Sequence, residues 1–248
     1  MEVAEHLAAL RHEGDLLADA AAVVAPGAAI PTCPEWTMRD LVLHLGQVHR
    51  WATAVVAHPA PAPADAAEAM GPVPDDGGLV QWFRSGHRAL CDTIEHADPT
   101  AAYWTFMDAP SPLAFWARRQ CHETGMHRAD AESASGPISA FAPDVAADGI
   151  DELLVGFITR SGGRLKSDTP RALSVRATDT GDDWLVRISN DDVVTERAAG
   201  AADCTVTGRA SDLHLLLWNR ADADPLTIDG DCSLLDLWRD SVTVRWGR

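Results

Sequence analysis

Glu123-Thr124-Gly125-Met126-His127 lies within a stretch, Pro112 to Ser133, whose composition predicts a helix. Side chains four positions apart on an α-helix project from the same face, so Glu123 and His127 can both reach one ion. The face that carries them is polar where a core face should be apolar. Its members are Trp116, Gln120, Glu123, His127 and Asp130.

A third candidate ligand, His44, belongs to an earlier predicted helix. Thr37-x-x-Asp40 is a capping-box pattern that starts this helix near Met38, and apolar residues then recur at helical spacing on a stripe that includes His44. His49 lies about 140° around the helix from His44, on the polar side with Arg50. We therefore expect His44, and not His49, to face the bundle interior.

His44, Glu123 and His127 together predict a site for one divalent metal, with a coordination position left open for a thiol or water. The alternative is an ordinary solvated Glu–His pair and a hydrogen-bonded core histidine. His122 points about 100° away from Glu123 and, like His49, is expected outside the ligand set, beside the ligands or on the surface. Cys121 is expected to pack in the core, as are the other scattered cysteines.

The pattern along the chain predicts two domains. A helical part is followed by short segments rich in β-branched residues, so the fold class is α then α+β, with a helical bundle over 1–163 and a small antiparallel-sheet domain with short helices over 164–248. A Pro-rich connection over 58–76 interrupts the bundle. Helices are expected at 3–24, from 38, and at 78–97, 112–133, 145–159, 211–218 and 233–240, and strands at 172–177, 184–188, 192–196 and 204–207. The Pro31 to Trp36 segment is expected to form a turn.

Composition excludes several functions. A net charge of -17 opposes binding to nucleic acid, whose phosphates attract Lys and Arg. The acidic start and the lack of a run of about 18 apolar residues oppose a secretory or membrane protein. We expect a cytoplasmic monomer. Lys166 is the only lysine, and this arginine bias indicates a high-GC genome.

The segments Pro34–Leu45 and Glu123–Asp130 resemble the mycothiol-dependent maleylpyruvate isomerase family of actinobacteria. The resemblance covers nearly the whole chain and implies a DinB-like four-helix bundle followed by a domain similar to sterol carrier proteins. It implies zinc bound by His44, Glu123 and His127, and mycothiol as the thiol cosubstrate. The turn Pro34-Glu35-Trp36 departs from the family's Pro-Gly-Trp.

The resemblance also suggests a role for the second domain. Leu217-Trp218-Asn219-Arg220 takes the place of a Tyr-x-x-Gly-Arg segment, so Arg220 is a candidate catalytic residue that reaches the site. The alternative is a surface arginine that follows a short helix.

Zinc would hold a thiol as its thiolate, which adds to a small electrophilic substrate. Either cis-trans isomerisation or S-transfer can follow. Two other functions remain open: a binding module without turnover, and a hydrolase that uses zinc-bound water. Asp130 is the only candidate base for the hydrolase, but it is better placed to orient a ligand histidine.

Overall fold

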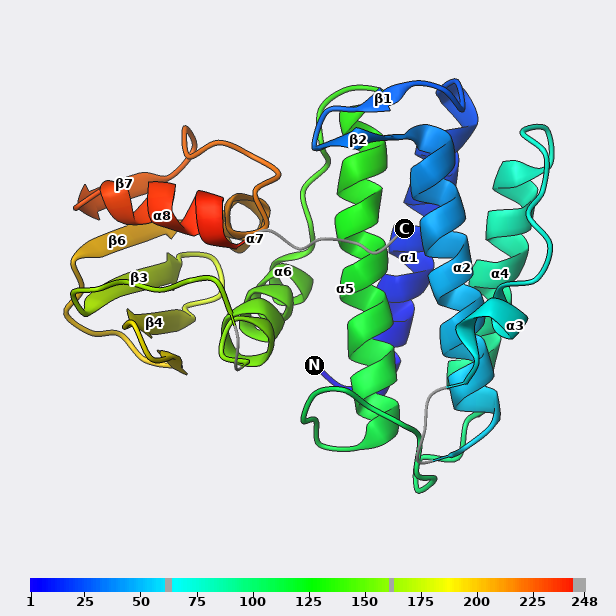
Figure 1. The fold of residues 1–248 in the computed structure, drawn as a ribbon, viewed down its shortest axis with the longest axis horizontal. Helices are drawn as coiled ribbons and strands as arrows, with labels where there is room; N and C mark the ends of the chain where they lie inside the picture. Colours follow the sequence, from blue (N-terminus) through cyan, green and yellow to red (C-terminus); the bar gives the residue numbers. More distant parts are fainter. Residues whose placement is uncertain (61–63, 161–162, 243–248) are drawn as a thin grey trace. The chain divides into compact units, whose positions relative to one another are not determined.

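The computed structural model describes residues 1–60, 64–160 and 163–242. Contacts divide the chain into two units, Met1–Ser139 and Ala140–Arg248. The first unit is helical, and the second combines a sheet with short helices (Figure 1). The predicted fold class is therefore confirmed.

The first unit is built on four long helices that lie side by side (Figure 1). Both α1 and α2 pack on α4 and α5. Apolar residues at helical spacing fill the space between them, and Leu17, Leu45 and Phe83 are fully buried. The helices are α1 (Val3–Val23), α2 (Met38–Ala57), α4 (Leu79–His96) and α5 (Pro112–Ser133).

The starts of α2 and α5 follow from local chemistry. Thr37 caps α2 with its side chain, and the Asp40 carboxylate accepts a hydrogen bond from the Thr37 backbone N–H at 2.9 Å, so the predicted capping box is confirmed. The Ser111 hydroxyl accepts from the Ala114 N–H at 3.1 Å, with Pro112 at the first helical position. These caps set the register of the two helices that carry the candidate ligands.

Two connections in the first unit differ from their predicted form. The segment expected as a turn, Pro31 to Trp36, lies within a small antiparallel hairpin formed by β1 (Ala29–Ile30) and β2 (Cys33–Thr37). Within the connection 58–76, the short helix α3 (Ala66–Met70) forms, and residues 61–63 lie outside the described part. The hairpin joins α1 to α2, so it positions Thr32 and Trp36 beside Asp130 and His127 in the C-terminal half of α5.

The second unit contains a five-stranded sheet with the order β5-β4-β3-β6-β7. Three of its pairings are antiparallel, but β3 and β6 run parallel, so the sheet expected to be antiparallel is mixed. Residues 197–203 carry the chain from β5 to β6, and Gly200 lies against Leu185 of β4. The strands are β3 (Arg171–Ala177), β4 (Asp183–Ile188), β5 (Val193–Glu196), β6 (Cys204–Gly208) and β7 (Thr227–Gly230).

Short helices complete this unit. The segment expected as a fifth α-helix is an α-helix, α6 (Pro143–Asp151), that continues into a π-helical segment (Glu152–Phe157). It packs on α7 (Ala210–Leu217), and its π-helical end contacts β5, so contacts assign it to the sheet unit. This division differs from the expected boundary after Gly163, which left the segment with the bundle. The last helix is α8 (Ser233–Ser241).

No helix in the described part of the chain combines the length and the apolar character that crossing a membrane requires.

Candidate metal site in the helical unit

The polar stripe of α5 is buried along its whole length. Trp116, Gln120, Glu123, His127 and Asp130 are each at most 4% exposed. His44 of α2 faces this stripe, and its side chain is 17% exposed, which makes it the candidate ligand nearest to solvent. Because α2 and α5 are direct neighbours, residues about eighty positions apart in sequence meet here.

The donor atoms of His44, Glu123 and His127 converge. One donor atom from each residue lies within 4.8 Å of the other two. Glu123 Oε1 is 3.6 Å from His44 Nε2 and 3.4 Å from His127 Nε2. Donors bound to one tetrahedral zinc at about 2.1 Å would lie roughly 3.4 Å apart. The nitrogen and carboxylate donors therefore fit a divalent metal such as zinc, in both type and spacing.

Arg119 holds the second oxygen of Glu123. Its Nη2 donates to Glu123 Oε2 at 2.6 Å, and both side chains are buried. Burial alone would raise the pKa of Glu123, but Arg119, together with His127 and His44, keeps that pKa well below its usual value. Glu123 is thus ionised, with Oε1 directed to the histidines, as a one-oxygen ligand requires.

Asp130 orients His127. Asp130 Oδ2 is 2.9 Å from His127 Nδ1, and Thr32 donates its hydroxyl to Asp130 Oδ1 at 2.6 Å. Burial would lower the pKa of His127, but the hydrogen bonds to Asp130 and Glu123 raise it. The bond at Nδ1 directs Nε2 toward the cluster, which is the usual carboxylate–histidine arrangement behind a bound metal. The expected orienting role of Asp130 agrees with this geometry.

Trp36 covers the two histidines. Its ring stacks on His127 at 5.8 Å between centroids and tilts against His44 at 4.9 Å. A large aromatic ring at this place limits the rotation of both imidazoles and keeps water from one side of the cluster.

The expectation that His49 lies on a polar side of α2 is wrong. His49 is fully buried, and its Nε2 is 2.9 Å from Thr124 Oγ1. Its ring also lies 5.3 Å from that of His87 on α4. Burial and the neighbouring His87 lower the pKa of His49 well below the ordinary histidine value. His49 is buried because α4 packs on the side of α2 that the helix pattern alone suggested would face solvent.

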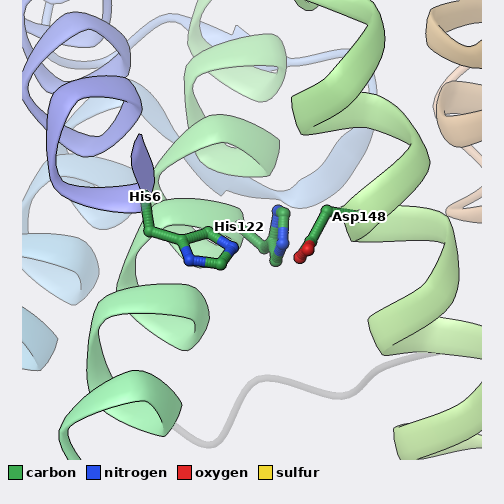
Figure 2. Close-up of side chains that lie close together, drawn as sticks. All are labelled: His6, His122 and Asp148. Carbon is green, nitrogen blue, oxygen red and sulfur yellow. The ribbon is translucent and has the colours of Figure 1, made fainter. Parts of the chain in front are cut away.

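His122 is also buried, and its ring stands edge-on to that of His6 from α1, 5.8 Å away between centroids (Figure 2). It therefore faces α1, whereas Glu123 faces α2, in keeping with the expected 100° between them. Cys121 is fully buried, as predicted, whereas Cys33 is only partly buried and Cys232 is exposed, so the expectation of core packing is wrong for Cys232.

Arg220 belongs to the sheet unit. It follows α7, and its Nη1 donates to the Trp218 carbonyl at 2.9 Å. Its side chain is half-buried. The expected role of Arg220 in catalysis stays a proposal.

The sequence pattern did not predict that Arg119, Thr32 and Trp36 would contact the metal cluster or the residues that support it. Arg119 lies four positions before Glu123, so its ion pair follows the same helical rule that joined Glu123 to His127. No comparable local signal identified Thr32 or Trp36, because they approach α5 from the β1–β2 hairpin.

Comparisons with known proteins agree with this architecture. The sequence profile of the mycothiol maleylpyruvate isomerase N-terminal domain matches residues 6–132, and that of the MDMPI C-terminal domain matches residues 144–237. No curated protein sequence matches the chain.

Two solved structures share the fold. The crystal structure of the mycothiol-dependent maleylpyruvate isomerase aligns with a TM-score of 0.64, at 13% identity, over 92% of this chain and 93% of that chain. A histidine-to-alanine mutant of the isomerase aligns over the same shares of both chains, at the same identity, with a TM-score of 0.63. Because the N-terminal profile alone spans about half of the sequence, the chain belongs to the mycothiol maleylpyruvate isomerase family, which is a family of enzymes.

Proposed function

We propose that this chain is a mycothiol-dependent enzyme with a divalent metal held by His44, Glu123 and His127, and that this metal is zinc. The observation that carries the proposal is the convergence of these three donors on two neighbouring helices. The match to solved isomerases supports the fold, and the family supports the thiol. When bound, such a metal lowers the pKa of a coordinated thiol and holds it as the thiolate.

The residues around the cluster suit this chemistry. Arg119 keeps Glu123 ionised, Asp130 orients His127, and the partly exposed edge of His44 leaves a route for a small thiol. In an isomerase, the thiolate adds to a conjugated double bond, rotation follows about the new single bond, and the thiolate leaves. In an S-transferase, the adduct is the product.

The contacts of Asp130 favour thiol chemistry over hydrolysis by a metal-activated water. One oxygen of Asp130 bonds His127 and the other accepts from Thr32. A carboxylate held at both oxygens is poorly placed to take a proton from water. The intact donor set likewise supports an enzyme over a binding module.

Metal analysis of purified variants tests the site. His44→Ala, Glu123→Ala and His127→Ala are expected to lose the bound metal, while His49→Ala and His122→Ala retain it if they fold. An unchanged metal content in His127→Ala would contradict the assignment. Thermal stability of the metal-loaded protein should rise with mycothiol more than with glutathione, and this rise should vanish without metal.

Arg220 is proposed to bind an anionic group of the substrate, because its planar guanidinium donates two parallel hydrogen bonds to a carboxylate. Arg220→Ala should lower kcat/KM and leave metal content and folding unchanged. Arg176→Ala, at an exposed arginine of β3, is the control. Normal turnover in Arg220→Ala would refute this role.

A further inference from the structure

Gln120 is the residue of the α5 stripe whose side-chain carbonyl oxygen lacks a donor in the described part of the chain. It is 2% exposed, and its side-chain Oε1 has no hydrogen-bond partner within residues 1–60, 64–160 and 163–242. The other polar side chains of the stripe are bonded: the Trp116 indole donates to the Trp104 carbonyl, Glu123 accepts from Arg119, and His127 pairs with Asp130.

A buried carbonyl oxygen that lacks a donor destabilises a protein, and such groups are rare in folded chains. An acceptor that is unsatisfied within the protein is therefore a place where a donor from outside it, a water or a group of a ligand, can bind. For Gln120 that donor must be an N–H or O–H group, because a side-chain carbonyl oxygen can only accept.

The place of Gln120 relates this donor to the metal cluster. Gln120 lies three residues before Glu123, about 4.5 Å along the helix axis and on nearly the same face. Farther along α5, the Trp116 ring contacts Trp51 of α2, at 5.4 Å between centroids. Gln120 thus lies along the α2–α5 interface, between the metal cluster and this tryptophan pair.

Part of the α2 surface beside this interface is accessible to solvent. His44, Gln47 and Trp51 follow one another at helical spacing on α2, and all three are only half-buried. These residues form an accessible line from the cluster toward Trp51, along which a bound molecule would pass the buried Gln120.

We propose that Gln120 accepts a hydrogen bond from an N–H or O–H group of the thiol that binds at His44, Glu123 and His127. Gln120 would then select thiols that carry such a donor a few atoms from the sulfur, as thiols derived from cysteine do. This inference rests on the proposed function and assigns a binding role to a residue outside the ligand set.

The test uses two small thiols that differ by one donor. N-acetylcysteamine carries an amide N–H two carbons from its sulfur, and its N-methyl analogue lacks that N–H. Calorimetric titration of the zinc-loaded full chain should show that N-acetylcysteamine binds about tenfold more tightly than its N-methyl analogue, which corresponds to the loss of one hydrogen bond. Gln120→Leu should bind the two thiols equally, while the exposed-site control Gln81→Leu keeps the preference.

The titrations distinguish a failure of the role of Gln120 from a failure of the metal-dependent thiol site. A preference that persists in Gln120→Leu, or equal binding by the wild type, overturns the role of Gln120 and leaves the metal-dependent thiol site standing. If neither thiol binds, or if binding needs no metal, the proposed function fails and this inference fails with it.

Stability of the metal-free protein gives a second readout. Gln120→Leu removes a buried acceptor that has no donor, so its denaturation midpoint should match or exceed that of the wild type. A lowered midpoint would show that the amide is satisfied inside the protein, and it would overturn the proposal.

Discussion

Arg119→Met is expected to destabilise the metal-free protein more than the metal-loaded one, and so to tighten metal binding. Arg119 is 4% exposed and donates to Glu123 Oε2 at 2.6 Å, so it is the nearest cation to a buried carboxylate. Methionine keeps most of the length of the side chain and removes the charge. The same arginine that stabilises Glu123 without metal also repels a divalent cation at Oε1.

The magnitude follows from this geometry. Removing one partner of a buried ion pair costs about 3–5 kcal/mol, because the remaining charge is uncompensated. With metal bound, Glu123 still has a cation at its other oxygen, so the loss is that of a charge-assisted hydrogen bond, about 1.5–3 kcal/mol. The difference of about 1.5–2 kcal/mol corresponds to metal binding that is about ten- to thirtyfold tighter.

Urea unfolding with and without zinc measures the two losses of stability. Zinc competition against a chromophoric chelator measures the change in metal affinity. Arg88→Met, at an exposed arginine of α4, is the control and should change neither quantity by more than about 0.5 kcal/mol. Weaker zinc binding in Arg119→Met, or equal losses of stability with and without metal, would refute the reasoning. Either result would mean that Arg119 acts mainly by positioning Glu123.

Asp130→Asn should weaken metal binding by about 10- to 100-fold with little change in fold, because it replaces the carboxylate behind His127; equal zinc affinity in a competition assay would contradict this. Gly14→Ala should cost about 1–3 kcal/mol in urea unfolding, because its methyl group would meet the His87 ring; a loss below about 0.5 kcal/mol would show that the ring can move. Burial lowers the pKa of His49 and His87 in the folded state. As the pH falls, these histidines therefore bind protons in the unfolded chain before they do so in the folded protein. The free energy of unfolding should fall below pH 6.5, by up to about 1.4 kcal/mol per pH unit for each group. Unfolding midpoints at pH 7.5 and 5.5 check this, and an unchanged midpoint would contradict the buried neutral state.

Local patterns were sufficient to predict the four long helices of the first unit and the change to short strands after them. Thr37 and Asp40 marked the start of α2 because their capping bonds span only three residues. The i and i+4 spacing placed Glu123 and His127 on one face for the same reason. The parallel pairing of β3 with β6 was not predictable in this way, because it joins strands that are distant in sequence and depends on where residues 197–203 cross.

The sequence by itself determined the residue types of the candidate ligands and the face of each helix on which they lie, because helical geometry relates neighbours within one turn. Only the tertiary structure decided which faces of each helix are covered by another helix and which face solvent. Packing of α4 on α2 buried His49, which the helix pattern had placed on a polar side. The hairpin before α2 likewise brought Thr32 to Asp130, a contact between residues 98 positions apart that depends on how segments distant in sequence pack.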